Sequence, residues 1–414
     1  MRRLLACLMA VPLVTTACAH ASSRTTMVLG ALYPTSGPQA AGGTEEERGV
    51  RLAVEWADGH GGVRSRRVRL ETVDAPRPEA VPSAMRELER RGARVVVGSH
   101  GSAVSAVAAD VATREGMVLW ETGAVGQTTD YVKGGRNFFR LAPMGANLGQ
   151  AAISFVRDQL LPRLSARPRL WFGVAYVDDS YGRAVASGAT REIRRRGLPL
   201  AGSFAYDAHR ADFAAVAHEI GAAHVDVLFV SAYIDDGVAL RRAVVDAHVP
   251  LVASIGTSSS YCMPAFGARL GPAAVGLFAS DKPDGPDVNP AALTPEARRA
   301  LAWAQARYQA RWHDAMSAAA LSGFSNTYGL LVHVLPGAAS DTPGAVARAA
   351  LATKLPVGAL ANGGGIDLEP PGAPNAGENR NAAGVIWEWI GPGQRAVVWP
   401  QAFATHPVVP LPLQ

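Results

Sequence analysis

A regular alternation of short apolar runs and helical segments is the feature of this sequence that most constrains its fold. In the first part of the chain the apolar runs have the length and β-branched content of buried strands, and they span residues 27–33, 68–73, 94–98 and 117–121. Their unbroken apolarity is typical of parallel strands that are covered on both faces. The helical segments between them have the spacing of β-α-β units, which predicts an α/β lobe.

The same alternation returns further along the chain. Strands are predicted there at residues 170–179, 200–207, 226–233 and 250–256. An apolar stripe at helical spacing lies between the second and third of these strands, and it consists of Phe213, Val216, Ala217 and Ile220. A chain of 414 residues that is 48% hydrophobic can bury a second core, so we expect two α/β lobes.

Three segments rich in turn-forming residues are predicted to cross between the lobes. They span residues 140–147, 278–290 and 360–381, the last with a surface loop. The predicted domains are lobe I, residues 25–143 and 283–362, and lobe II, residues 144–282 and 363–403. Late strands are expected at residues 385–391 and 396–400. Helices are expected to begin after the caps Thr294 and Thr342, because a proline follows each of them.

The N-terminus predicts export. Arg2 and Arg3 precede the apolar run LLACLMAVPLV, which is too short to span a bilayer, so residues 1–21 are typical of a signal peptide. Two cleavage sites stay open. The sequence TTAC ending at Cys18 resembles a lipobox, and AHA ending at Ala21 fits an A-x-A site. We favour a lipoprotein held at the extracytoplasmic membrane surface by acylated Cys18, with a periplasmic protein as the alternative.

Cysteine content and charge exclude further classes of protein. Cys7 leaves with the signal peptide and Cys18 is acylated or removed, so Cys262 has no intramolecular disulfide partner. The net charge of +5 falls to +3 without Arg2 and Arg3, and it is carried mostly by arginine spread along the chain. An exported protein without a basic aromatic patch is not expected to bind nucleic acid.

The segment VVVGSHGSAVS, residues 95–105, indicates an anion site. A buried strand ends at Gly98 and a helix begins near Ser102, so backbone N–H groups point out of the end of the strand. A carboxylate or phosphate would settle there. No lysine follows Gly101 as in a P-loop, and the spacing is not that of a G-x-S-x-G nucleophile. The alternative is a plain connection between strand and helix.

Apparent metal motifs fail on spacing, and no metal or cofactor is expected. His218 and His224 are six residues apart, whereas zinc on one helix face needs histidines at i and i+4. The carboxylates of DKPDGPD lack the flanking helix and closing glutamate of a calcium loop. Asp178 and Asp179 follow a strand end, where they could contact a ligand or form a solvated turn.

Four motifs in order resemble the extracytoplasmic solute-binding proteins of branched-chain amino-acid ABC transporters. They lie at residues 28–75, 95–105, 178–183 and 381–405. The resemblance covers nearly the whole mature chain. It implies a type 1 periplasmic-binding fold, in which two Rossmann-like lobes joined by three hinge crossings close over a small solute. It also implies a monomer that is not an enzyme and has an ABC permease as partner. Lac-repressor-like regulators share the fold, but a signal peptide stands here in place of their DNA-binding segment.

The resemblance also implies ligand contacts. The serine that holds the ligand carboxylate falls on Ser102, and the next strand end contributes backbone groups at Gly123. Two tyrosines of the second lobe fall on Tyr181 and Tyr233, for which packing is the alternative role.

Departures from the family pattern bear on the identity of the ligand. A threonine is replaced by Val125, an aromatic residue is replaced near Gly42, and the acid that pairs with the amino group is Gly256 or Thr257. These changes argue against a branched-chain amino acid. Glu121 could supply a displaced negative charge, or it could be a solvated glutamate at the sheet edge.

The sequence therefore predicts a solute-binding protein of an ABC importer that captures a small carboxylate-bearing solute. Two alternatives stay open: a lipid-anchored receptor that feeds a sensor system, and an exported hydrolase.

Overall fold

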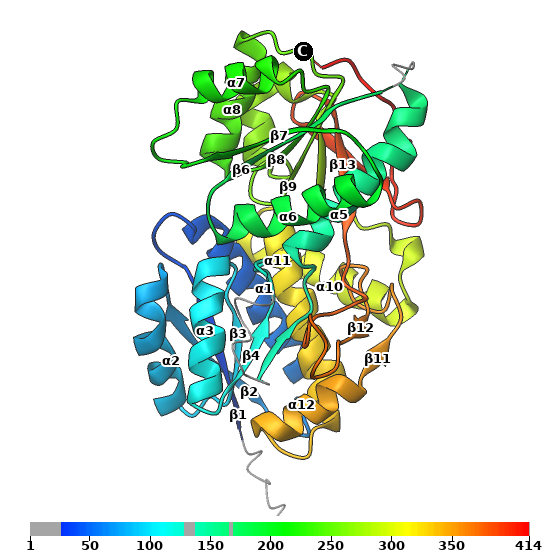
Figure 1. Cartoon of the computed structure of the whole chain (residues 1–414). Helices are drawn as coiled ribbons and strands as arrows, with labels where there is room; N and C mark the ends of the chain where they lie inside the picture. The colour runs from blue at the N-terminus through cyan, green and yellow to red at the C-terminus, as the bar shows by residue number, and fades with distance from the viewer. Residues whose placement is uncertain (1–25, 128–136, 165–168, 414) are drawn as a thin grey trace, which may run out of the picture.

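Two lobes, each built on one sheet, make up the protein (Figure 1). The computed structural model describes residues 26–127, 137–164 and 169–413. The predicted signal peptide and Cys18 lie outside the described residues. Within these residues, no helix is both long and apolar enough to cross a membrane.

The first sheet is fully parallel, with strand order β2-β1-β3-β4-β5. Its strands are β1 (Met27–Tyr33), β2 (Val68–Asp74), β3 (Val95–Gly98), β4 (Val118–Glu121) and β5 (Phe138–Arg140). One face is covered by α2 (Val81–Arg90) and α3 (Ser102–Arg114), and the other by α1 (Ala40–Gly59) and α11 (Ala318–Tyr328). The helices α10 (Pro295–Trp312) and α12 (Pro343–Ala352) complete this lobe.

The second sheet is mostly parallel, with strand order β14-β13-β10-β9-β8-β6-β7. Its parallel strands are β6 (Phe172–Val177), β7 (Leu200–Tyr206), β8 (Val227–Ser231), β9 (Ala253–Thr257) and β10 (Phe278–Asp281). Two antiparallel strands close it, β13 (Val385–Gly391) and β14 (Gln394–Trp399). The helices of this lobe are α5 (Gly145–Phe155), α6 (Ser180–Arg195), α7 (Phe213–Ala222), α8 (Ile234–Asp246) and α9 (Pro264–Leu270).

The predicted α/β fold of two sheets is confirmed, with three local corrections. The sequence did not predict β5, and it assigned β10 to a crossing because Ser280 and Asp281 look like turn residues. Both strands are short and buried, so neighbouring strands rather than local propensity fix them. The third correction concerns a helix cap: Thr294 accepts a hydrogen bond from Ala297 N, but the side chain of Thr342 makes no such bond to α12.

The segment before the third crossing contacts the first lobe. The short strand β12 (Ile366–Asp367) pairs with β11 (Lys354–Leu355). Further on, Arg140 Nε donates to Glu378 Oε2 at 2.8 Å, and both side chains are buried. We therefore propose that the third crossing follows residue 381 rather than 362, while the remaining domain bounds stay as predicted.

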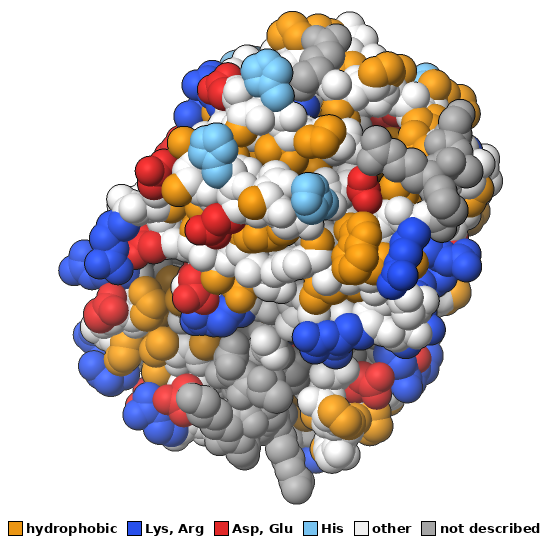
Figure 2. Space-filling model, turned by 45° about the horizontal axis from the view of Figure 1, so that its top comes forward, with side chains coloured by type: hydrophobic (Ala, Val, Ile, Leu, Met, Phe, Trp, Pro, Cys, Tyr) orange, Lys and Arg blue, Asp and Glu red, His pale blue; other side chains and the backbone are white. Residues whose placement is uncertain are grey.

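The carboxyl ends of the central strands of both sheets point toward the boundary between the lobes (Figure 1). There α3 of the first lobe contacts α6 of the second. In an open α/β sheet, ligands bind at the carboxyl ends of the strands. On the face drawn in Figure 2, Lys and Arg side chains are interspersed with Asp and Glu rather than gathered in one field.

Candidate functional site

The loop after β3 forms the first half of the site. Gly98 ends the strand with φ +153, and a Cβ at this position would overlap the carbonyl oxygen of Leu32, so only glycine fits. Gly101 then enters α3 in an extended conformation without a side-chain cap, and Ser102 is the first helical residue, 8% exposed. The amides of the first helical turn and the helix dipole favour an anion at this end of α3.

Glu121 connects the loop after β3 to the loop after β4 through hydrogen bonds. Its carboxylate accepts hydrogen bonds from Ser99 N at 2.9 Å and from Gly123 N and Ala124 N at 2.8 Å each, and Ser105 Oγ donates to it as well. Burial, followed by the nearby charge of Glu46, raises the pKa of Glu121. Because the side chain is fully buried and bonded within its own lobe, it positions the loops that carry Ser102 and Gly123.

Glu46 is a second buried carboxylate beside Gly123, and sequence reasoning missed it. Thr122 Oγ1 donates to Glu46 Oε1 at 2.5 Å, and His100 Nδ1 lies 2.8 Å from Glu46 Oε2. A Cβ on Gly123 would overlap this carboxylate, so glycine is needed for its close approach. The helical spacing could have indicated its burial, because Glu46 precedes Val50 by four residues and therefore lies on the apolar face of α1.

The second lobe contributes a pair of tyrosines. The Tyr181 hydroxyl donates to the carbonyl of Ser258 and lies 3.3 Å from Thr257 Oγ1, so the start of α6 contacts the end of β9. The Tyr233 hydroxyl donates to Asp179 Oδ2 at 2.7 Å. The two rings lie 5.3 Å apart, centroid to centroid. Burial raises the pKa of both hydroxyls, so they stay protonated, and each donates its proton within the second lobe.

Four aspartates that follow β6 and β8 in this lobe differ in burial. Asp178 and Asp235 are exposed and form ion pairs with Arg183 and Arg269. Asp179 caps α6 by accepting from Gly182 N at 2.8 Å. Asp236 is buried and accepts from the Tyr206 hydroxyl at 2.8 Å, and burial raises its pKa.

Lys282 joins the two halves, and the sequence analysis did not single it out. It follows β10 of the second lobe, it is 8% exposed, and its Nζ donates to the carbonyl oxygen of Gly123 in the first lobe at 2.8 Å. The structure thus brings Ser102, Glu121 and Gly123 together on one side of the boundary, and Tyr181, Tyr233 and Thr257 on the other. Whether these residues bind a ligand remains a prediction.

A family model described as periplasmic binding protein matches residues 26–373 of this sequence. The chain belongs to the periplasmic binding protein family. The matched family is one of binding proteins and not of enzymes, so the hydrolase alternative is set aside.

Individual relatives support this membership. The chain is 28% identical to Leu/Ile/Val-binding protein homolog 8 of Brucella abortus over 236 residues, which cover 56% of this chain and only 58% of that relative. A branched-chain amino acid transporter substrate-binding protein from Streptococcus pneumoniae, solved with isoleucine, superposes with a TM-score of 0.70 at 18% identity. The superposition covers 91% of this chain and 100% of the S. pneumoniae chain. A solute-binding protein from R. palustris, solved with benzoate, superposes with a TM-score of 0.68 at 16% identity. That superposition covers 91% of this chain and 98% of the R. palustris chain.

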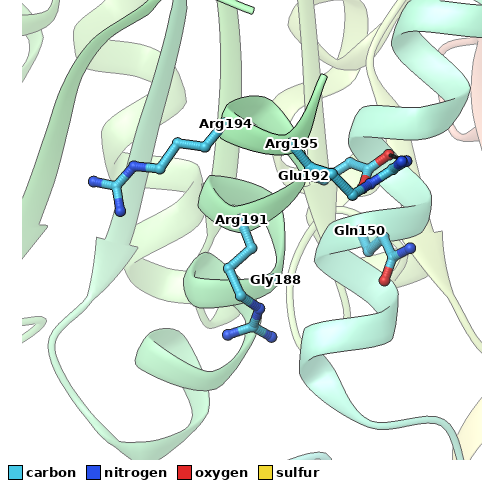
Figure 3. Close-up of a pocket in the computed structure, with 6 residues that line it drawn as sticks. All are labelled: Gln150, Gly188, Arg191, Glu192, Arg194 and Arg195. Carbon is cyan, nitrogen blue, oxygen red and sulfur yellow. Dashed lines mark hydrogen bonds and ion pairs between the residues drawn. The ribbon is translucent and has the colours of Figure 1, made fainter. Parts of the chain in front are cut away.

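A separate pocket of about 570 Å³ lies between α5 and α6, away from these loops (Figure 3). It is lined by Gln150, Gly188, Arg191, Glu192, Arg194 and Arg195. Glu192 accepts hydrogen bonds from Arg195, which lower the pKa of its carboxyl to about 2. Figure 3 shows Arg191 and Arg194 extending from α6 in other directions, so this pocket does not gather polar groups onto one point.

The described part of the chain holds no cluster of His, Cys, Asp and Glu side chains that could bind a metal ion. His218 and His224 are both exposed, and His224 lies beyond the end of α7. Cys262 is a buried free thiol that donates to Asp281 Oδ2 at 3.0 Å, and burial raises its pKa.

Proposed function

We propose that this protein captures a small carboxylate-bearing solute between its two lobes and hands it to an ABC permease. The observation that supports the proposal is the boundary where α3 contacts α6: the start of α3 at Ser102, which no side chain caps, lies in one lobe, and the ring pair of Tyr181 and Tyr233 lies in the other. The α3 end favours a carboxylate, and the tyrosine rings offer an apolar wall with polar tips.

The mechanism is a shift of population between an open and a closed arrangement of the lobes. A solute that contacts both half-sites binds the closed arrangement better, so it raises the fraction of closed molecules. A permease that recognises the closed form would then receive only loaded protein. No covalent chemistry is needed for this cycle.

The class of solute is an amino acid or a related small acid. Two structural neighbours were solved with isoleucine and with benzoate, and both compounds carry a carboxylate. Three further residues belong to this proposal. Glu121 orders the loops, Gly123 links Glu121 to Lys282 through its backbone, and Thr257 is the polar group beside Tyr181.

For the place of action, we propose an exported lipoprotein anchored through Cys18 and acting as a monomer. In membrane fractions of the native host the wild-type protein should sediment with membranes, and Cys18→Ala should move it to the soluble fraction. A mature N-terminus at Ser22 would contradict the anchor but not the solute-binding function.

A thermal-shift screen tests the function. A solute that binds only the folded state raises the melting temperature, by the equivalent of about 2.7 kcal/mol at a hundred times its dissociation constant. The screen should include leucine, isoleucine, phenylalanine, benzoate, 3-phenylpropanoate and 4-methylpentanoate, with the corresponding neutral amides. We expect at least one carboxylate to raise the melting temperature by more than its amide does. Stabilisation by amides alone would contradict a carboxylate site.

A further inference from the structure

Lys282 places a buried ammonium group at the boundary between the lobes. The residue is 8% exposed, and its Nζ contacts the carbonyl oxygen of Gly123 at 2.8 Å. Within the described residues, no carboxylate oxygen lies within the 4.0 Å of an ion pair with this Nζ. One carbonyl oxygen does not neutralise a buried cation, and buried charges in proteins are normally paired.

The neighbouring acid on β10 faces away from this point. Successive side chains of a strand point to opposite faces. Asp281 accordingly points toward Cys262 in its own lobe, and Lys282 extends to Gly123 in the other. Burial raises the pKa of Asp281 more than the nearby charge of Lys282 lowers it, so the Asp281 carboxyl balances this cation only in part.

The carboxylates of the first lobe are committed to partners of that lobe. Glu46 is bonded to His100 and Thr122, and Glu121 to backbone amides and the Ser105 hydroxyl. Both groups order the loops after β3 and β4. Among the described residues, no carboxylate is left to pair with Lys282 at ion-pair distance, so this position favours an anionic group on the solute.

The same contact disfavours a solute with an ammonium group here. The Gly123 carbonyl, which would accept from such a group, already accepts from Lys282. A second ammonium beside it would place two like charges in a buried site. In the second lobe, the positions where an acid was expected hold Gly256 and Thr257.

We propose that Lys282 is an anion-binding residue of the site between the lobes, and that the solute is a carboxylic acid without an α-amino group. The Tyr181 and Tyr233 rings, 5.3 Å apart, favour an apolar or aromatic body on this acid. This inference rests on the proposed function and narrows the class of solute.

Calorimetric titration of the purified protein with matched probes tests it. The probes are 3-phenylpropanoate, phenylalanine and 3-phenylpropanamide, and, for an aliphatic body, 4-methylpentanoate, leucine and 4-methylpentanamide. In the wild type we expect the acid to bind at least tenfold more tightly than the amino acid of the same skeleton. Lys282→Met should weaken binding of the acid tenfold or more and change binding of the amide less than threefold. Lys354→Met, on an exposed lysine, is the matched control.

The outcomes separate the two proposals. An amino acid that binds as tightly as its deaminated partner overturns this inference and leaves the carboxylate site intact. Equal weakening of acid and amide by Lys282→Met also overturns it, because Lys282 would then only hold the lobes together. If neither acids nor amino acids bind, the proposed function itself fails. If Lys282→Met does not fold, Lys282→Arg should keep the preference for the acid, and losing it would count against an ionic role.

Discussion

At the scale of single residues, the first half-site depends on two buried carboxylates rather than on its serines alone. Glu121 accepts the amides of Ser99 and Gly123 and so fixes two loops against each other. Glu46 fills the space that a side chain at position 123 would need. Desolvating two carboxylates costs free energy that their hydrogen bonds offset, which is typical of a site held rigid for binding.

Replacing Ser102 tests the anion site directly. Ser102→Ala should weaken a carboxylate solute by on the order of 1 to 3 kcal/mol, the range for a hydrogen bond to a charged group. Calorimetric titration with the acid found in the thermal screen measures this loss. Ser83→Ala removes an exposed hydroxyl on α2 of the same lobe and should leave the affinity unchanged. Wild-type affinity in Ser102→Ala would refute the proposed role of the loop after β3.

Gly123 offers a second test at this scale. A methyl group there would overlap the Glu46 carboxylate, so Gly123→Ala should lower the free energy of unfolding by about 1 to 3 kcal/mol, as overpacking does. Urea unfolding provides the measurement. The control is Gly59→Ala at the end of α1, where no atom lies within 4 Å of the added carbon. That change should be neutral or stabilise by about 0.4 to 1 kcal/mol. Equal stability of the two variants would contradict the tight approach of Glu46.

At the scale of elements, β13 carries a pH-sensitive side chain. Glu388 is buried, and its Oε2 accepts from Val409 N at 3.3 Å. Burial raises its pKa from 4.5 to about 7. Because the folded state binds this proton more tightly than the unfolded state, the stability that it contributes is present below about pH 4.5 and is lost as the pH rises to about 7.

Glu388→Gln should remove this pH dependence. The wild type should lose on the order of 1 to 3 kcal/mol relative to the variant between pH 5 and pH 8, as the carboxyl ionises in a buried site. Urea unfolding at the two pH values measures the difference. Glu79→Gln, whose carboxyl is 74% exposed, should follow the wild type at both. Parallel pH profiles of wild type and Glu388→Gln would show that Glu388 ionises normally.

At the scale of the whole molecule, the lobes contact each other where α3 meets α6 and where Lys282 reaches Gly123. The strands of each sheet pair only within their own lobe, so separating the lobes at these contacts would leave both sheets intact. Domain closure around a solute needs an interface of this kind.

Small-angle scattering tests this closure. With a saturating solute from the thermal screen, the radius of gyration should be smaller than without it, because the solute favours the arrangement in which both half-sites touch it. A compound of similar size that does not bind serves as the control. An unchanged radius would mean that the lobes do not move on binding.

The sequence by itself determined the α/β class, most of the strands and the glycine- and serine-containing turn at residues 98–102 that leads into α3. These features depend on local patterns: apolar periodicity, strand length, and glycine and serine at the end of a strand. The sequence did not predict strand β10, because its four residues carry no such pattern.

Only the tertiary structure decided which side chains meet at the site. Lys282 and Gly123 are 159 residues apart and Glu46 and His100 are 54 apart, so their contacts depend on how the lobes and helices pack. From the sequence, Glu121 was either a negative charge facing the ligand or a solvated residue at the sheet edge. In the fold its carboxylate is buried and accepts hydrogen bonds from four donors. Burial and pairing set the charge of a site, and both arise from residues distant in sequence.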